Sequence, residues 1–285
     1  MKPVHLLSPA KLNLYLRVIN KRPDGYHNIK TVFERIDLFD EITLRTLSEK
    51  KIKIRCDHPH VPLGPKNLVH RAAALLQEDL GTRKGVQIHI KKRIPVAAGL
   101  AGGSSNAATV LAGLNRLWKL GLKKTELESY ARRIGSDVAF FLNDCSWALG
   151  TERGDRIKRL DIKAKLWHVV VVPRLKIYSW KVYGGLKLRL TKRNDDVNIL
   201  IHNLQKNNFF VLNRFLHNDL ETVVLKLAPQ LGHLKDRLKS LNAQGVMISG
   251  SGPAVFGLVE TRSAALKIQK QIAKQYQQTF VVQTL

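Results

Sequence analysis

The sequence predicts an α+β fold built from two lobes. Strand-like and helix-like stretches are mixed along the 285 residues, without the regular alternation of strand and helix that a doubly wound sheet requires. Two glycine-rich segments, residues 95–108 and 249–257, each follow a strand-like stretch. A chain of this length can bury a substantial core, as one large domain or as two closely packed ones. We expect two lobes.

The N-terminal part of the chain predicts a β hairpin or meander. Apolar and polar residues alternate over residues 10–18, so Lys11 and Asn13 share the face opposite the apolar one. A Pro-Asp-Gly turn at residues 23–25 separates this strand from a second β-rich run over residues 32–44. The hairpin therefore brings two long strands together.

The rest of the chain predicts helices interspersed with strands. Up to residue 150 the expected elements are a helix over residues 67–77, a strand over residues 86–90, a helix over residues 107–118, a helix from a Thr125 and Glu128 capping box to Gly135, and a helix from residues 136–137 that buries Phe140 and Phe141. Beyond Gly154 we expect a strand pair, helices around residues 196–205 and 228–241, strands on either side of the second glycine-rich turn, and a final helix carrying Ala265, Ile268, Ile272 and Tyr276.

Residues 95–108 have the composition of a phosphate-binding loop. Glycine admits backbone conformations closed to other residues and lets an anion reach successive N–H groups. The helix that follows adds unsatisfied N-terminal donors. The Walker pattern fails because Ser104, Ser105 and Asn106 follow the last glycine, and the dinucleotide fingerprint and the protein-kinase signatures are absent. For this loop taken alone, an ordinary tight turn is the alternative.

The formal net charge of +26 raises a second class of function, polyanion binding. The basic residues are scattered, however, with groups at residues 91–93, 132–133, 153–165 and 187–193 and no basic tail. We therefore expect no specific nucleic-acid partner, since general basicity of the proteome or attraction of anionic substrates accounts for the charge equally well.

Targeting and metal signals are lacking in the sequence. No run of eighteen apolar residues or signal peptide is evident, and Cys56 and Cys145 lack CxxC spacing. We expect a cytoplasmic protein with reduced thiols and no membrane partner. Residues 56–60 combine Cys, Asp and two His, but a zinc site usually needs a second ligand pair. No metal site is expected there.

Three segments resemble the motifs of the GHMP small-molecule kinases, in the same order and at matching separations. They are SPAKLNLYL at residues 8–16, PVAAGLAGGSSNAA at residues 95–108 and SGSGPAVF at residues 249–256. Within that superfamily, the family of 4-diphosphocytidyl-2-C-methyl-D-erythritol kinases is resembled by RPDGYHNIKTVF at residues 22–33, KNLVHRAA at residues 66–73, GSDVAFFL at residues 135–142 and NDLE at residues 218–221. The match is loose over residues 155–215.

The resemblance implies a two-lobed GHMP kinase fold. Its N-terminal, ATP-binding lobe would span residues 1–153 and resemble the second domain of ribosomal protein S5. Its C-terminal lobe would span residues 154–285 and be ferredoxin-like. The implied reaction is transfer of the γ-phosphoryl group of ATP, accompanied by Mg²⁺, to the 2-hydroxyl of the family's substrate, in the methylerythritol phosphate route to isoprenoid precursors.

The resemblance also implies the catalytic pair. Asp137 matches the family's general base and Lys11 its catalytic lysine, a cation that would keep the carboxylate ionised and stabilise developing charge. From position alone, Asp137 could equally be a helix cap, and Lys11 could be a solvated strand lysine. Among other functions, the Gly-Tyr-His segment at residues 25–27 speaks against a homoserine or mevalonate kinase. Retention of Lys11 and Asp137 speaks against a non-catalytic polyanion-binding protein on the same fold.

The binding residues are likewise implied by the resemblance. For ATP they are Asn67, Pro95, Val96, Ala97, Ala98, Gly99, Leu100, Ala101, Gly102, Gly103, Ser104, Ser105, Asn106, Gly250, Ser251 and Gly252. For the substrate they are Asn13, Tyr26, His27, Asp137 and Tyr183, with Trp180 as the alternative to Tyr183 and hairpin packing as the alternative for Tyr26. Ala97 and Ala101 stand where the family more often has glycine, so a left-handed backbone at either would be strained.

Overall fold

The computed structural model describes residues 2–187 and 197–285, so all of the basic segment 187–193 except Lys187 lies outside the described residues. The N-terminal elements are β1 (Val4–Lys21), β2 (His27–Leu47), β3 (Ile52–Cys56), α1 (Leu68–Asp79), β4 (Gly85–Lys91), α2 (Gly102–Trp118), α3 (Lys124–Ile134), α4 (Val138–Leu142), β5 (Trp147–Thr151) and β6 (Arg156–Arg159). The C-terminal elements are β7 (Trp167–Val171), α5 (Ser179–Gly184), α6 (Val197–Gln205), α7 (Phe209–Leu212), β8 (His217–Asn218), α8 (Glu221–Leu227), α9 (Gln230–Ser240), β9 (Gln244–Ile248), β10 (Val255–Val259), α10 (Arg262–Ile272) and β11 (Thr279–Gln283).

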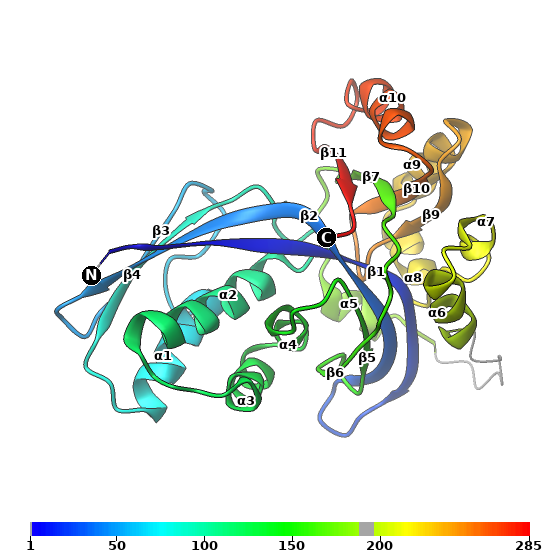
Figure 1. The fold of residues 1–285 in the computed structure, drawn as a ribbon. Helices are drawn as coiled ribbons and strands as arrows, with labels where there is room; N and C mark the ends of the chain where they lie inside the picture. The colour runs from blue at the N-terminus through cyan, green and yellow to red at the C-terminus, as the bar shows by residue number, and fades with distance from the viewer. Residues whose placement is uncertain (1, 188–196) are drawn as a thin grey trace.

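The larger sheet is organised around the predicted hairpin. β1 and β2 pair antiparallel along nearly their whole length and run across the molecule as two long ribbons (Figure 1). The sheet order is β3-β4-β2-β1-β8, with β5 joined to β2 and β6 joined to β5. The turn between the long strands holds Gly25 at a φ of +83°, a conformation that costs glycine little. The hairpin prediction is confirmed.

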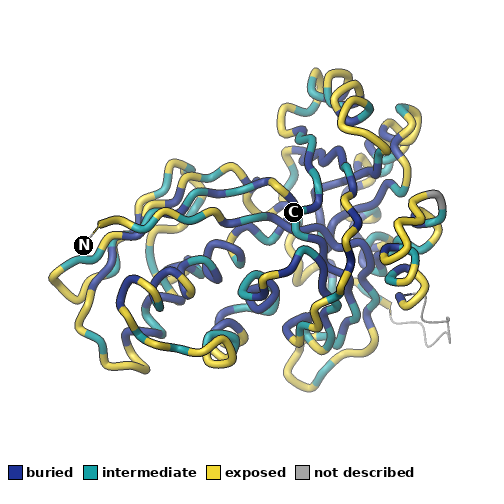
Figure 2. Tube along the Cα trace, in the orientation of Figure 1, coloured by how far each residue is buried: buried dark blue, intermediate teal, exposed yellow. Residues whose placement is uncertain are grey.

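The helices α1 to α4 lie together along one side of this sheet (Figure 1). Their apolar residues share a core with sheet residues such as Leu44 and Ile88, and Trp118 at the end of α2 is fully buried in it. The polar face of β1 is buried as well, because Lys11 and Asn13 are only 3% and 2% exposed. Both faces of the hairpin are therefore covered near its middle, as the dark tube in Figure 2 shows.

The smaller sheet belongs to the C-terminal lobe. Its order is β11-β7-β10-β9 with every pairing antiparallel. Val169 and Val171 face a core that includes α8, α9 and α10, whereas Val170 and Phe256 face the core shared with Leu12 of β1. The two sheets are therefore joined by one apolar cluster, which fits the predicted two-lobed α+β fold.

Several predicted boundaries were wrong. The capping box is not made by Thr125 and Glu128, because the N-cap residue of α3 lies two residues earlier, at Lys123, whose backbone N–H donates to Glu126 at 2.8 Å. Phe140 is buried, but Phe141 is only partly so. The local sequence could not place the start of α3, because either Glu126 or Glu128 could be the acidic residue of the capping box.

The C-terminal half also differs from the prediction in detail. The expected strand pair after Gly154 is two unrelated strands, since β6 pairs with β5 in the larger sheet and β7 lies in the smaller one. Tyr276 lies beyond the end of α10. The short helices α5, α7 and α8 and the strand β11 were not predicted from the sequence.

The lobe boundary at residues 153 and 154 stays a prediction. None of the described helices has the length and apolar content needed to cross a membrane.

Candidate active site

A cavity of about 760 Å³ opens where β1, the first glycine-rich loop, α4 and α5 meet. Most of the sequence-predicted site residues line it, namely Lys11, Asn13, Tyr26, His27, Asn67, Pro95, Val96, Ala97, Ala98, Gly99, Ala101, Gly102, Gly103, Ser104, Asn106, Asp137, Tyr183, Gly250, Ser251 and Gly252. Leu100 and Ser105 are not among the lining residues. Leu100 is buried in the apolar core, and the Ser105 hydroxyl accepts a hydrogen bond from Ser8 at 2.8 Å.

Lys11 reaches the cavity from the middle of β1. Its ammonium donates to the carbonyl oxygen of Gly99 at 2.9 Å and to the side-chain oxygen of Asn13. Burial lowers the pKa of Lys11, and the charge of Asp137 opposes that change. The Asn13 amide in turn donates to Thr31 at 2.8 Å. The lysine is therefore fixed by hydrogen bonds and aimed at the glycine loop, rather than solvated as a surface lysine would be.

Asp137 stands at the N-cap position of α4 but does not cap it. Its side chain makes no hydrogen bond to the backbone N–H groups of the helix. Within the described part of the chain, it is also the one carboxylate that lines the cavity. Its oxygens are therefore free to accept a proton or a hydrogen bond from a ligand, which a capping carboxylate could not do as readily.

The first glycine-rich loop adopts the strained backbone that its composition suggested. Ala97, Gly99 and Ala101 have φ values of +55°, +81° and +55°. A Cβ at Gly99 would lie 2.2 Å from the carbonyl oxygen of Ser249, so only glycine fits there. Helix α2 begins at Gly102 without a side-chain cap. Its first N–H groups therefore remain available to an anion.

The second glycine-rich turn supports the first loop. Ser249 donates from its hydroxyl to the carbonyl oxygen of Gly99 at 3.0 Å. The backbone N–H of Ala254 donates to the carbonyl oxygen of Ala98, also at 3.0 Å. These bonds connect segments about 150 residues apart. The C-terminal lobe therefore helps to shape the loop of the N-terminal lobe.

A buried carboxylate that the sequence did not single out lies behind the loop. Asp40 is fully buried and accepts hydrogen bonds from the backbone N–H groups of Arg93 and Ile94 and from the side chain of Asn106. It also forms an ion pair with Lys92, which lines the cavity. No local pattern distinguishes Asp40 from other acidic residues of a strand, so only the folded chain reveals this network.

Aromatic side chains also line the cavity. The rings of His27 and Tyr183 stack at 5.2 Å with an interplanar angle of 29°. Burial, aided by the charge of Asp137, raises the pKa of Tyr183, whereas burial and then Lys21 lower the pKa of His27. Trp180, the alternative to Tyr183, also lines the cavity but is 70% exposed. The geometry favours Tyr183 as the ring that packs beside His27.

Tyr26 lies on the hairpin turn and is 56% exposed. The guanidinium of Arg153 lies over its ring at 5.2 Å. This contact differs from the packing against the sheet that was the alternative for Tyr26. Arg153 is held in turn by an ion pair with Asp155. One aromatic face is therefore already covered by a cation.

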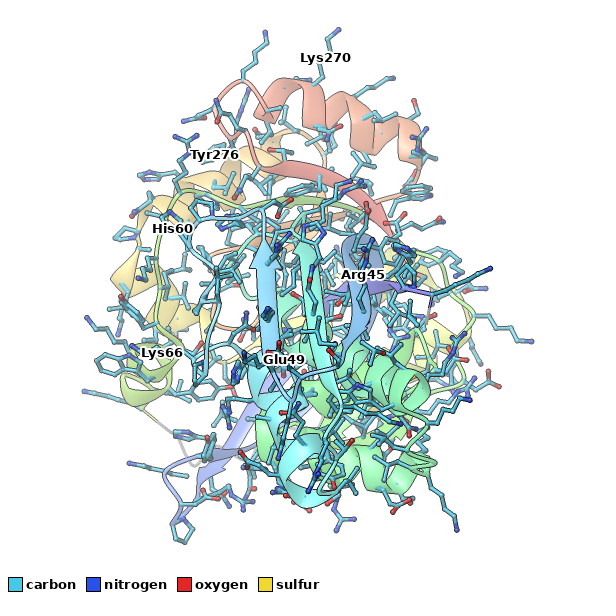
Figure 3. The ribbon with its side chains drawn as sticks, turned by 90° about the vertical axis from the view of Figure 1, so that its left-hand side faces the viewer. Arg45, Glu49, His60, Lys66, Lys270 and Tyr276 are labelled. Carbon is cyan, nitrogen blue, oxygen red and sulfur yellow. The ribbon has the colours of Figure 1, made fainter. Side chains whose placement is uncertain are left out.

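Basic side chains outnumber acidic ones in the lining of the cavity. Besides Lys11, its lining includes Lys66, Lys92 and Arg153, and among the described residues Asp137 is the one acidic lining residue. The sequence could not select these three from 48 basic residues. Other basic side chains are spread over the surface and point outward, as Lys270 does (Figure 3).

In the described part of the chain, no three His, Cys, Asp or Glu side chains gather as metal ligands, and Asp57 accepts a hydrogen bond from the backbone of Lys92.

Comparison with family models matches both lobes. Residues 67–144 match the GHMP kinases N terminal domain, and residues 200–278 match the GHMP kinases C terminal domain. The chain is 42% identical over 279 residues to the 4-diphosphocytidyl-2-C-methyl-D-erythritol kinase of Geobacillus kaustophilus, covering 98% of this chain and 96% of the relative. The chain belongs to the GHMP kinase family. The corresponding enzyme of Shouchella clausii is also 42% identical, with 92% of this chain and 87% of the relative covered.

Solved structures of GHMP kinases share the fold. A crystal structure of 4-(cytidine 5'-diphospho)-2C-methyl-D-erythritol kinase superposes with a TM-score of 0.83 at 32% identity, covering 98% of each chain. A homoserine kinase from Cytophaga hutchinsonii superposes with a TM-score of 0.79 at 20% identity, covering 99% of this chain and 94% of the other. The second likeness shows the fold alone. The α+β GHMP fold expected from the motifs is confirmed.

Proposed function

We infer that this protein is a kinase that transfers the γ-phosphoryl group of ATP to the 2-hydroxyl of 4-diphosphocytidyl-2-C-methyl-D-erythritol. The observation that carries the inference is one cavity that is lined by Lys11 and Asp137, by the first glycine-rich loop and by the stacked rings of His27 and Tyr183. Relatives at 42% identity over nearly the whole chain carry the name of this kinase. The reaction belongs to the route to isoprenoid precursors.

The proposed chemistry uses Asp137, Lys11 and the first glycine-rich loop. Asp137 accepts the proton of the substrate hydroxyl while the hydroxyl oxygen forms a bond to the γ-phosphorus of ATP. The bond from that phosphorus to the oxygen that bridges the β- and γ-phosphates breaks, which releases ADP. Lys11, held by the Gly99 carbonyl, stabilises the charge that develops on the transferring group. The loop N–H groups and the first turn of α2 bind the remaining phosphate oxygens.

The residues present fit magnesium that arrives with the nucleotide. Mg²⁺ keeps several waters and binds together with substrate phosphates. The Ser104 hydroxyl lines the cavity and would hold the ion with the phosphate oxygens, so the Asp137 carboxylate stays available as the base. When bound, the ion would neutralise phosphate charge.

A cytoplasmic location is part of the same proposal, because ATP is a cytosolic metabolite and Cys56 and Cys145 are free thiols.

The aromatic end supports the choice of substrate. A pyrimidine ring can stack on Tyr26 or beside the His27 and Tyr183 pair. Arg153 and Lys66, which also line the cavity, offer positive charge to the diphosphate of this substrate. A homoserine or mevalonate substrate has neither a pyrimidine nor a diphosphate, so it would leave these groups unused.

The test is a panel assay with purified protein, ATP and Mg²⁺. The acceptors are 4-diphosphocytidyl-2-C-methyl-D-erythritol, homoserine and mevalonate, and the readouts are ADP release and the mass of the phosphorylated product. Turnover of the cytidyl substrate alone is the expected result. Preferential phosphorylation of homoserine or mevalonate would overturn the proposal, as would ADP release without a phosphorylated acceptor.

A further inference from the structure

Arg35 lies beside the catalytic lysine, Lys11, but its side chain contacts another element, helix α4. In the pairing of β1 and β2, it is the direct partner of Lys11. Its guanidinium donates to the carbonyl oxygens of Phe140 and Phe141 at 3.4 and 3.5 Å, and to that of Asn143. It also lies over the Phe140 ring at 5.4 Å. Arg35 therefore holds the C-terminal end of α4 against β2.

This helix needs an external support. α4 has only five residues, and isolated helices shorter than about 12 residues are marginal in water. Its last carbonyl groups have no partner within the helix and carry partial negative charge. A guanidinium, with five donors in a planar fork, satisfies several of them at once. The helix is also supported by the burial of Val138 and Ala139 in the core with α2, by the Asn143 amide, which donates to the Ala139 carbonyl oxygen at 2.9 Å, and by the stacking of Phe33 on Phe140 at 4.8 Å.

The contact is made at a cost. Burial lowers the pKa of Arg35, which means that the fold disfavours its charge. Its Nε atom is buried without a hydrogen-bond partner among the described residues. A buried polar atom without a partner is expensive. An apolar side chain at this position would avoid both costs but could not bind the carbonyl groups.

The other end of the same helix carries Asp137. Five residues of helix span about 7.5 Å, and the Asp137 side chain makes no capping bond of its own. The position of its carboxylate therefore follows from the position of α4. We propose that Arg35 is a positioning residue, which fixes α4 on β2 and thereby sets the separation between Asp137 and Lys11. Arg35 is not among the residues that line the cavity, and the proposal rests on the proposed kinase function.

The first arm of the test measures the helix directly. Amide hydrogen exchange of residues 138–142 is compared in wild type, Arg35→Met and a control, Arg71→Met. Arg71 also donates to a carbonyl oxygen near a helix end, that of Arg133 in α3, but does not contact α4. We expect exchange in α4 to accelerate by about tenfold or more in Arg35→Met and to stay at the wild-type rate in Arg71→Met. Unchanged exchange would overturn the proposal.

The second arm measures catalysis in the same proteins. Loss of alignment should lower kcat by roughly 10- to 100-fold in Arg35→Met. The KM values for ATP and for the cytidyl substrate should change by less than about threefold, because neither binding end is touched. Arg35→Lys keeps a donor and should recover part of the loss. A folded Arg35→Met protein with wild-type kcat, or an equal loss in Arg71→Met, would reduce Arg35 to a structural role.

The two arms separate this inference from the proposed function. If wild type fails to phosphorylate the cytidyl substrate, the function is wrong, whereas the exchange arm still decides whether Arg35 holds α4. If Arg35→Met does not fold, Arg35→Lys and Arg35→Gln, which each retain a donor, are compared by both measurements. Wild-type exchange and wild-type kcat in both milder variants would overturn the proposal.

Discussion

At the scale of single residues, the first prediction concerns Asp137. Asp137→Asn keeps the size of the side chain but removes the base, so kcat should fall by about 10² to 10⁴. ATP binding and thermal stability should be retained, since the carboxylate makes no hydrogen bond to its helix. Steady-state kinetics and calorimetric titration with ATP check this. Near-normal turnover of a folded variant would show that another group accepts the proton.

The second prediction concerns the pH dependence due to Lys11. Burial lowers its pKa, and the nearby Asp137 charge only partly opposes that change. If the protonated lysine is the active form, activity is present below its lowered pKa and is lost as pH rises through it. The alkaline limb of kcat should therefore lie below the usual lysine value of about 10.4. Lys11→Arg should move this limb upward, whereas a limb at or above 10.4 in wild type would contradict the prediction.

The third prediction concerns Tyr26. Tyr26→Ala should remove about 1 to 3 kcal/mol of base stacking. The loss should raise the KM for the cytidyl substrate, because stacking is equal in ground and transition states. Tyr26→Phe keeps the ring and its contact with Arg153, so it should be mild. A weaker affinity for ATP with an unchanged substrate KM would mean that the two ends of the cavity are assigned in reverse.

At the scale of structural elements, the first glycine-rich loop contains avoidable strain. Ala101 precedes α2 at a φ of +55°, and a left-handed backbone costs a residue with a Cβ about 1–2 kcal/mol. Ala101→Gly should therefore raise the free energy of unfolding by roughly 1 kcal/mol and lower the KM for ATP. Denaturant melts and initial rates measure the two effects.

A matched control lies in the same helix. Ala112 is an exposed residue within α2, and glycine in a helix interior costs about 0.5–1 kcal/mol relative to alanine. Ala112→Gly should therefore destabilise the protein while Ala101→Gly stabilises it. The same sign for both substitutions would show that the loop is not strained at Ala101.

The elements themselves were predicted to different degrees. The long β1 and β2 strands, the helix α2 and the strands around the second glycine turn follow from periodicity and turn residues, which are local properties. The five-residue α4 was placed correctly because Gly135 and Asp137 mark its start, but α5 was missed. Its six residues are too few for a helical period to appear.

At the scale of the whole molecule, a buried polar contact joins the two sheets. Glu34 on β2 and His168 on β7 are fully buried, and the His168 Nε2 lies 2.9 Å from the Glu34 carboxylate. Thr284 also donates to this carboxylate at 2.5 Å. Glu34→Met would leave both partners unsatisfied, so the free energy of unfolding should fall by roughly 2 to 4 kcal/mol.

Glu41 provides the comparison for Glu34. It lies on the same strand but forms exposed ion pairs with Lys91 and Arg93. Pairs of that kind contribute about 0–1 kcal/mol. In denaturant melts, Glu41→Met should therefore change stability little, while Glu34→Met should lower it with a single transition. Two separate transitions in Glu34→Met would show that the lobes fold independently of each other.

The sequence by itself determined the fold class and the position of the glycine-rich loop, and its resemblance to known motifs gave the candidates Lys11, Asp137 and Tyr26. Each depends on neighbours in the chain: a glycine-rich turn between strand and helix, an alternation of polar and apolar residues, or a short motif. For the same reason, the sequence could indicate that a left-handed backbone at Ala97 and Ala101 would be strained. The catalytic and binding roles of these residues stay predictions.

The tertiary structure alone decided the rest of the site. Arg35, Asp40 and Arg153 are ordinary charged residues of strands and turns in the sequence, and nothing local separates them from the other charged residues. Their importance comes from partners far away in the chain, such as the α4 carbonyl groups more than 100 residues after Arg35. A charge gains a role through burial and through the groups that surround it, and both exist only once the chain has folded.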